Sequence, residues 1–223
     1  MMESAIGKAK LNGSTRERIL YEASFLFARR GYHATTTREL AEAVGIRQPS
    51  LFHHFESKGA IAEALLDWDL GHILPYAQAL ASRKGSAAVR LYTYLIHDLR
   101  HLTLAPYNLN GIYAEDVMGD PAFARWAKRR IELHTVVERI VRQGMEAGEL
   151  VVMRSDVVRE AVAGIVTRTL TLYSGRRQST DLSDQIASLL LRGVLADPSR
   201  LGEVRRAAHA GLDKAAERVK ASF

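Results

Sequence analysis

The feature that most constrains the fold of this chain is a pair of helix-starting signals near its beginning. In each signal a hydroxyl residue is followed three positions later by a glutamate, Ser14 with Glu17 and Thr36 with Glu39. This is the reciprocal capping pair, in which two side chains satisfy the first free N–H groups of a helix. After Ser14 the apolar residues recur at helical spacing, and Gly31 follows the last of them. The chain is therefore predicted to begin with helices, not with strands.

The second of these helices is short, and a third follows at once. Gly45 ends the second helix, Ile46 and Arg47 form the connection, and Pro49 stands in the first turn of the next helix, where its missing N–H costs nothing. Two short helices joined by a tight turn with a glycine form a helix-turn-helix. One face of the pair must be apolar, so that the second helix is held rigidly on the first. The residues that can supply this face are Leu40, Val44, Ile46 and Leu51.

The opposite face of the helix-turn-helix carries side chains that suit DNA. Near the start of a recognition helix, glutamine can pair with adenine and arginine with guanine. Gln48 and Arg47 are so placed, Ser50 is small enough to allow close approach, and His53 also lies on the outside. Residues at helix starts or on the exposed flank suit phosphate contacts, which set the register without reading sequence. The candidates for these contacts are Thr36, Thr37, Arg38, His54 and Lys58.

The pattern stays helical over the rest of the chain, without a convincing run of alternating apolar and polar residues. Ser57 caps a long fourth helix that runs to about Ser82. Further helices are predicted over 86–104, 111–117, 121–147, 155–174 and 181–196, and the Ala-rich segment 198–223 is helix-prone. We therefore expect an all-α fold: a tail over 1–13, the helix-turn-helix domain over 14–60, a larger helical domain over 61–197 that shares the fourth helix, and a basic helical extension over 198–223.

The charge of the chain is concentrated at its two ends. Of the formal net charge of +6, residues 1–60 hold 9 Lys and Arg against 6 Asp and Glu, residues 198–223 hold 6 against 3, and residues 61–197 hold 16 of each. A basic terminal module suits a phosphate-binding surface. The chain has no cysteine, no signal-peptide-like start and no apolar run near the roughly 18 residues of a membrane span. We therefore expect a cytoplasmic protein without a membrane partner.

An ordered set of residues resembles the N-terminal signature of the tetracycline-repressor (TetR) family. The set consists of Thr35-Thr36-Thr37-Arg38-Glu39-Leu40-Ala41, Gly45-Ile46, Leu51-Phe52-His53-His54-Phe55 and Ser57-Lys58, and the resemblance covers about residues 14–62. It implies that Arg38, Gln48, Pro49, Ser50, Phe52, His53, His54 and Lys58 approach DNA, with Lys58 reaching a phosphate. Phe52 departs from the usual Tyr and lacks its hydroxyl. Arg47 replaces the Ser that typically caps the recognition helix, which weakens the cap.

The resemblance also implies what the remaining helices do. It indicates a transcriptional regulator, in most relatives a repressor, that binds a palindromic double-stranded DNA operator as a homodimer and is released by a small-molecule ligand. The helices at about 155–174 and 181–196 would pair across the dimer axis, although an ordinary core contact would explain the same apolar stripe. The residues of that stripe are Leu182, Ile186, Leu189, Leu190 and Val194.

A ligand pocket in such a helical bundle combines apolar walls with a few polar groups. Polar-tipped or aromatic residues placed among apolar helical positions are the candidates, each of which could also be an ordinary core or surface group. They are Tyr94, His97, His101, Tyr107, Tyr113, Trp126, His134, Arg168 and Tyr173. The loop 106–111 is either a lid or hinge of this pocket or a plain connector.

Other functions find little support in the sequence. There is no glycine-rich phosphate loop, no His-Glu-x-x-His helix and no nucleophile elbow, so an enzyme is not expected. His53 and His54 are adjacent on a helix and point about 100° apart, which does not suit a metal. We therefore expect no metal and no cofactor. The basic tail around Arg205 and Lys214 could serve a membrane surface, but its apolar stripe is too narrow and Ala-rich for strong interfacial binding.

Overall fold

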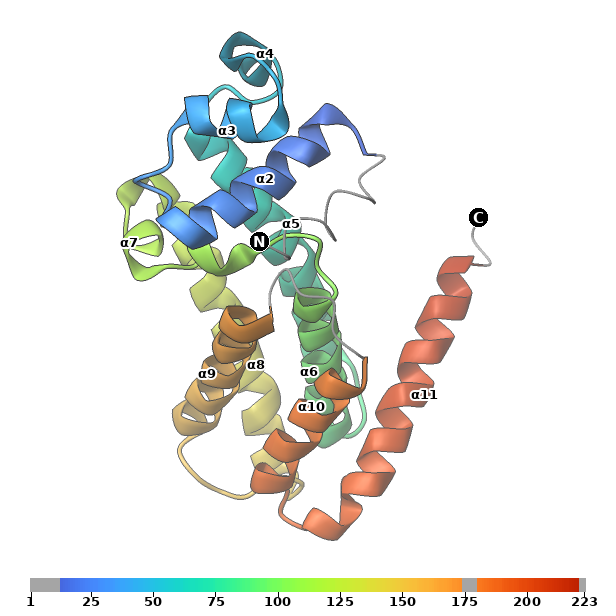
Figure 1. Ribbon diagram of the computed structural model, residues 1–223. Coiled ribbons are helices and arrows are strands. Elements are labelled where there is room, and N and C mark those ends of the chain that lie inside the picture. Colours follow the sequence, from blue (N-terminus) through green and yellow to red (C-terminus); the bar gives the residue numbers. More distant parts are fainter. Residues whose placement is uncertain (1–12, 174–179, 221–223) are drawn as a thin grey trace. The chain divides into compact units, whose positions relative to one another are not determined.

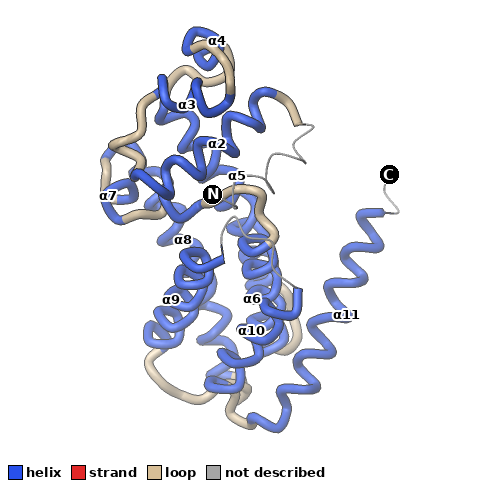
Figure 2. Tube along the Cα trace, in the orientation of Figure 1, coloured by secondary structure: helices blue, strands red, loops and turns tan. Residues whose placement is uncertain are grey.

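The computed structural model describes residues 13–173 and 180–220, and the regular structure within these ranges is helical (Figures 1 and 2). One isolated antiparallel bridge, between Leu150 and Leu195, accompanies the helices there. The predicted all-α fold is confirmed. The tail expected over residues 1–13 falls, apart from Gly13, outside the described residues.

The chain forms two compact units. The first unit joins the chain up to Asp69 with Pro106–Ala127, and the second joins Leu70–Ala105 with the chain from Lys128 onward. Two helices, α5 (Lys58–Ser82) and α8 (Ala124–Glu146), contribute residues to both units. The domain boundary near residue 60 stays a prediction, since the compact units divide the chain in a different pattern.

The helix-turn-helix of the first unit follows the local signals of the sequence. It comprises α2 (Thr15–Arg30), α3 (Thr37–Val44) and α4 (Gln48–Phe52), and α5 follows. Both capping boxes are present, before α2 and before α3. Gly45 ends α3 in the left-handed region with φ 76°, where a side chain would be strained. The side chain of Arg47 makes no capping hydrogen bond to α4, which agrees with the weakened cap expected from the replacement of Ser by Arg.

A segment from beyond α6 completes the first unit. It contains the short 3-10 turns η1 (Leu109–Gly111) and η2 (Pro121–Phe123), the short helix α7 (Glu115–Met118) and the start of α8. The helix predicted over 111–117 is therefore wrong in its bounds. Gly111 lies directly on the backbone of α2, because a Cβ on it would come within 2.3 Å of the Phe27 carbonyl carbon. This close backbone contact holds the chain in a turn at Gly111.

The second unit is arranged around α6 (Ala87–Thr103), whose residues are mostly buried. α6 packs against α9 (Ser155–Tyr173), α10 (Thr180–Val194) and α11 (Leu201–Lys220), with η3 (Pro198–Arg200) leading into α11 (Figure 1). Helix α11 corresponds to the segment 198–223, which was predicted to be helix-prone. Its side chains after Leu212 lie outside the described part of the chain.

Candidate nucleic-acid interface and effector region

The short helix α4 is held rigidly on α3, as a recognition helix must be. Leu40, Val44 and Leu51 are buried and Ile46 is half-buried, which is the apolar face expected from the sequence. The side-chain amide of Gln48 also donates a hydrogen bond to the hydroxyl of Thr37 at 2.8 Å. The first residue of α4 is thereby tied to the first residue of α3.

The outer side of this pair carries nearly all the residues predicted to contact DNA. Phe52 is 44% exposed, an unusual position for a large aromatic side chain on a helix with a buried opposite face. Arg38 is exposed as well and forms an ion pair with Glu42 one helical turn away, at 3.2 Å. The other exposed candidates are Thr36, Arg47, Gln48, Pro49, His53 and His54, and the half-buried ones are Thr37 and Ser50.

Two of the candidate hydroxyl groups are already engaged within the protein. The Thr36 hydroxyl accepts the Glu39 N–H at 3.2 Å as part of the capping box. Bonds from the backbone and side chain of Thr36 hold the pKa of the Glu39 carboxyl below its usual value. The hydroxyl of Thr37 accepts the Gln48 amide. In this structure these two residues therefore order the helix starts around the exposed face.

Lys58 stands apart from the other candidates. Its ammonium group donates to the carbonyl oxygens of Tyr32 at 2.8 Å, His33 at 3.2 Å and Thr35 at 2.8 Å. It also lies 4.4 Å from the centre of the Tyr32 ring. Burial lowers the pKa of this ammonium group. All three of its N–H donors bind the loop between α2 and α3, a role that no sequence pattern indicates.

Three of the nine pocket candidates belong to the first unit. Tyr107 packs edge-on against Trp68 with ring centres 5.2 Å apart. The Tyr113 hydroxyl donates to the buried carboxylate of Asp69. Trp126 is buried as well. Tyr107 and Tyr113 thus attach the segment 106–127 to the middle of α5, a connection that helical periodicity does not reveal.

The same segment is also attached to α2 and the loop after it. The backbone N–H of Asn108 donates to the Ser24 hydroxyl at 3.0 Å, and Phe123 packs edge-on against Tyr32 at 5.3 Å between ring centres. Gly111 lies on the α2 backbone as described above. The loop 106–111, whose role the sequence left open, is thus anchored on the helix-turn-helix unit.

The other six pocket candidates belong to the second unit. Two of them, His97 and His101, form a cluster with His72 and Tyr76 of α5, which were not predicted from the sequence. The His97 ring stacks on Tyr76 at 3.7 Å between centres, and its Nε2 lies 2.9 Å from Nε2 of His72. The His72 ring in turn stacks on His101 at 4.6 Å. Burial, followed by the neighbouring His72, lowers the pKa of His97 to about 4, which makes it neutral at pH 7. The i, i+4 spacing of these residues on α5 and α6 was the available signal.

The four remaining candidates occupy separate places. The Tyr94 hydroxyl donates to Asp98 at 2.8 Å within α6. His134 is half-buried on α8 and its pKa is lowered by burial, whereas Tyr173 is half-buried at the end of α9 and Arg168 is exposed on that helix. Among the described residues, no group of three or more His, Asp or Glu side chains is arranged to hold a metal ion.

Each of the helices α9 and α10 has an exposed, partly apolar side. Leu189 of α10 is 67% exposed, and the other four stripe residues, Leu182, Ile186, Leu190 and Val194, are half-buried. On α9 the exposed apolar residues are Val157 and Leu172, at 53% and 42%. Ala161 and Gly164 lie between them and are exposed too. Only the α10 residues were predicted from the sequence, although small residues at helical spacing also mark this side of α9.

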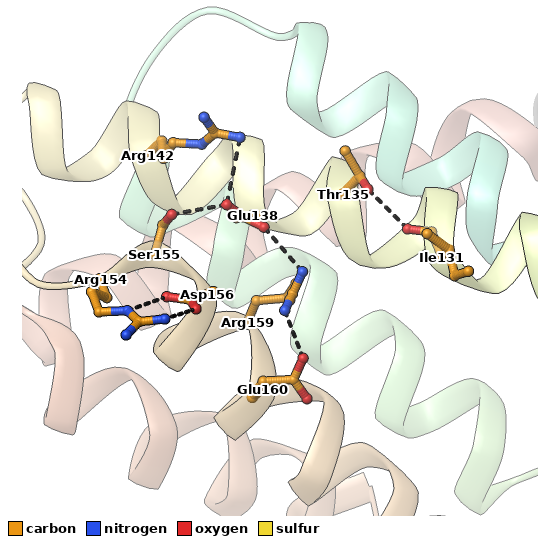
Figure 3. Close-up of polar contacts among 9 residues, drawn as sticks. All are labelled: Ile131, Thr135, Glu138, Arg142, Arg154, Ser155, Asp156, Arg159 and Glu160. Atoms are coloured by element: carbon orange, nitrogen blue, oxygen red, sulfur yellow. Dashed lines mark hydrogen bonds and ion pairs between the residues drawn. The ribbon is translucent and has the colours of Figure 1, made fainter.

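The beginning of α9 is fixed by the carboxylate of Glu138 on α8, as Figure 3 shows. Glu138 accepts a bond from the Ser155 hydroxyl at 2.9 Å and pairs with Arg159 at 3.3 Å, and its side chain is only 15% exposed. Arg142 adds a third contact at 3.5 Å. The position of α9, and of the face that it presents, therefore depends on a largely buried charge.

Two family models match the chain. The model "Bacterial regulatory proteins, tetR family" matches residues 19–65, and the model "Tetracyclin repressor-like, C-terminal domain" matches residues 86–194. The first range contains α3, α4 and most of α2. The second contains α6 to α10 and includes the segment 106–127 that packs on α2. α11 lies beyond both ranges.

Individual proteins of this kind resemble the chain over most of its length. The HTH-type transcriptional repressor Rv1474c of Mycobacterium tuberculosis is 29% identical over 181 residues, which cover 78% of this chain and 88% of the relative. The crystal structure of Mycobacterium smegmatis AmtR has a TM-score of 0.74 at 28% identity and covers 91% of this chain and 97% of that one. AibR in complex with isovaleryl coenzyme A and operator DNA has a TM-score of 0.66 at 18% identity, over 82% and 99%, and shares the fold.

Proposed function

Because the chain belongs to the TetR family of bacterial regulatory proteins and is thus a DNA-binding transcriptional regulator, we propose that it is a ligand-controlled repressor. It binds a palindromic operator as a homodimer, and a small molecule releases it. The observation that carries this proposal is the exposed polar face of α4, held by Leu51 and by the Gln48–Thr37 bond. A short, rigid helix with such a face is what the major groove accepts.

Within this proposal, α4 reads bases and its flanks bind phosphates. Gln48 and Arg47 face base edges, where their amide and guanidinium groups can recognise adenine and guanine. Phe52, His53 and His54 contact the sugar–phosphate backbone and groove wall. The exposed Arg38 and the N-terminal end of α3 attract a phosphate on the other flank. These roles fit the exposure of each side chain in the structure.

We assign Lys58 a different role from the one that the family signature implies. Its ammonium group is already shared among three carbonyl oxygens of the loop before α3. Moving it to a phosphate would leave those carbonyls without this donor. Lys58 therefore holds the α2–α3 loop, and with it the start of α3, in the conformation that DNA binding requires.

A second copy of the chain covers the exposed face of α9 and α10 in the proposed dimer. Leu189, Val157 and Leu172 are large apolar residues that water reaches in the single chain. Gly164 and Gly193 have open space where a side chain would stand, so two helices can approach closely there. A palindromic operator requires the two recognition helices of such a dimer to lie about 34–36 Å apart, one turn of DNA.

We propose that the effector binds the second unit and that the segment 106–127 transmits its effect to the helix-turn-helix unit. The segment continues from α6 into η1 and is anchored on α2 through Gly111 and Asn108. In this proposal, a ligand that contacts α6, which carries His97 and His101, acts on the helix-turn-helix unit through this continuous stretch of chain. A coupling of about 1–3 kcal/mol would change operator affinity roughly 5- to 150-fold.

The proposal needs no metal and no cofactor, and it locates the protein with the DNA in the bacterial cytoplasm. The helices in the described ranges include none that is long and apolar enough to cross a membrane. The exposed face of α9 and α10 is assigned to a second copy, so it is not needed for a lipid surface.

Selection of genomic fragments with the purified full-length protein tests the function. Three proteins are compared: the unchanged chain, the variant Arg47→Ala/Gln48→Ala, and Lys84→Ala as an exposed basic control in the turn before α6. We expect the unchanged chain and the control to enrich the same palindromic fragments, and the double variant to enrich none. Failure of the unchanged chain to enrich any fragment, or equal enrichment by the double variant, would refute the proposal.

A further inference from the structure

The C-terminal helix α11 lies outside both ranges that match the family, yet it packs against α6 and α10 in the second unit. Val204 and Ala208 on its inner side are 2% and 1% exposed. Leu201 and Leu212 continue this narrow stripe and are half-buried. The part of α11 whose side chains are described therefore belongs to the packed core of the second unit.

A buried carboxylate on α10 explains why α11 is held there. The Asp184 side chain is only 7% exposed. It accepts hydrogen bonds from the Tyr92 hydroxyl of α6 at 2.9 Å, from Arg205 of α11 at 2.5 Å and from His209 of α11 at 2.7 Å. The Tyr92 hydroxyl also contacts that of Ser188 at 2.7 Å. We call these five residues the Asp184 cluster.

The cluster depends on α11 for two of its hydrogen-bond donors, one of them the positively charged Arg205. Arg205 and His209 are four residues apart, so they lie on one side of the helix and reach the same carboxylate. Burial alone would raise the pKa of Asp184, but the bonds from His209, Arg205 and Tyr92 outweigh it and keep the carboxyl pKa below its usual value. Without α11, the charged carboxylate would keep only the neutral Tyr92 and Ser188 beside it, which is a costly arrangement in a buried place.

The two sides of α10 have different tasks. Ser183, Asp184, Ala187 and Leu191 are buried and face the rest of the second unit. The exposed residues on the opposite side are Asp181, Gln185, Leu189, Arg192 and Gly193. Rotation or withdrawal of α10 around Asp184 would therefore misplace the exposed residues as one body.

We propose that α11 fixes the orientation of α10 through the Asp184 cluster, so that the C-terminal extension is required for the pairing of two copies of this chain. This inference rests on the dimer of the proposed function and adds to it a contribution from a helix beyond the family's matched region. In this inference Arg205 and His209 are positioning residues, which act on the dimer face through Asp184.

The test is sedimentation equilibrium of the full-length protein and its variants. Arg205→Ala/His209→Ala removes both α11 partners of Asp184, and Arg206→Ala is the matched control, since Arg206 is the exposed neighbour of Arg205 on the same helix. We expect the double variant to raise the dimer dissociation constant at least tenfold and the control to leave it within twofold. Adding Asp184→Asn to the double variant should restore a large part of the dimer, because a neutral amide does not leave a buried charge without its partners.

The outcomes separate the proposals. A dimer of unchanged strength in the double variant would overturn the role of α11 and leave the proposed dimer intact. A monomeric unchanged protein would overturn the dimer itself and the role of α11 with it. Absence of rescue by Asp184→Asn, in a double variant that has lost the dimer, would also overturn the role assigned to the cluster. If circular dichroism shows that the double variant has lost helix, the single variant Arg205→Ala, which breaks only a half-exposed ion pair, gives the same comparison.

Discussion

At the scale of single residues, Gln48 and Lys58 differ in role: Gln48 is available to contact a base, whereas Lys58 stabilises the protein's own loop. The family resemblance implies that both approach DNA. Gln48 is exposed on α4 and uses one amide hydrogen to bond Thr37, which leaves its carbonyl oxygen and its other N–H for a base. Lys58 has given all its donors to backbone carbonyls. A signature position therefore does not by itself determine a contact.

Replacing Lys58 with Met tests this distinction. We expect the free energy of unfolding to fall by roughly 1.5–3 kcal/mol, the range for hydrogen bonds to a charged group, as measured by urea denaturation. Operator affinity should weaken while its dependence on salt stays as steep as before. If Lys58 contacted a phosphate, its loss would reduce the slope of log affinity against log salt concentration by about 0.9 for each Lys58, and by about twice that for the dimer. A slope reduced by this amount, with unchanged stability, would contradict the supporting role.

Gly111 provides a second test at this scale. A methyl group there would overlap the backbone of Phe27 and Ala28, which cannot move aside as a flexible side chain would. We expect Gly111→Ala to destabilise the protein by about 1–3 kcal/mol, as overpacking does. Gly211→Ala is the control, because space is open around this helical glycine and alanine should stabilise it slightly. Equal melting temperatures for the two variants would refute the close contact.

Among single residues, those with local signals were predictable from the sequence. The capping residues, the end of α3 at Gly45 and the exposed face of α4 depend on neighbours a few positions away. The engagement of Lys58 depends on carbonyl groups more than twenty positions earlier in the chain. No pattern of residue types encodes such a contact, because every residue has a carbonyl group.

At the scale of elements, the helices were predictable but their partners were not. Helical periodicity and Gly or Pro punctuation located every long helix to within a few residues. Periodicity reports only that a face is buried, and not which helix covers it. The packing of the segment 106–127 on α2, and of α11 on α6 and α10, therefore emerged only from the three-dimensional arrangement.

The connection between α8 and α9 yields a prediction at this scale. Glu138→Ala leaves the Ser155 hydroxyl and the Arg159 guanidinium without their shared acceptor. We expect a loss of roughly 1–3 kcal/mol in unfolding free energy, the cost of an unmade buried bond, and faster amide exchange at the start of α9. Glu146→Ala is the control, since Glu146 is exposed near the end of the same helix. Unchanged exchange along α9 would show that this carboxylate does not fix the helix.

At the scale of the whole molecule, the proposed binding of a palindromic operator requires two copies of the chain. Leu189 is the most exposed residue of the α10 stripe, and in the proposed dimer it is buried against the partner. Leu189→Asp should raise the dimer dissociation constant at least about tenfold, because a buried unpaired carboxylate costs well over 1.4 kcal/mol. Ile131→Asp, at an equally exposed position on α8, is the control. Equal sedimentation of both variants and the unchanged protein would place the interface elsewhere.

Base reading by α4 can be tested by one titration of operator variants. The affinity of the unchanged protein and of Gln48→Ala is measured on the selected operator and on operators with one symmetric pair of base pairs changed at a time. We predict that each change costs the unchanged protein about 1–3 kcal/mol per base pair in the core of the half-site. Gln48→Ala should lose this discrimination at one position and keep it at the others. An identical profile for both proteins, or a uniform loss of affinity with every preference intact, would contradict base reading by Gln48.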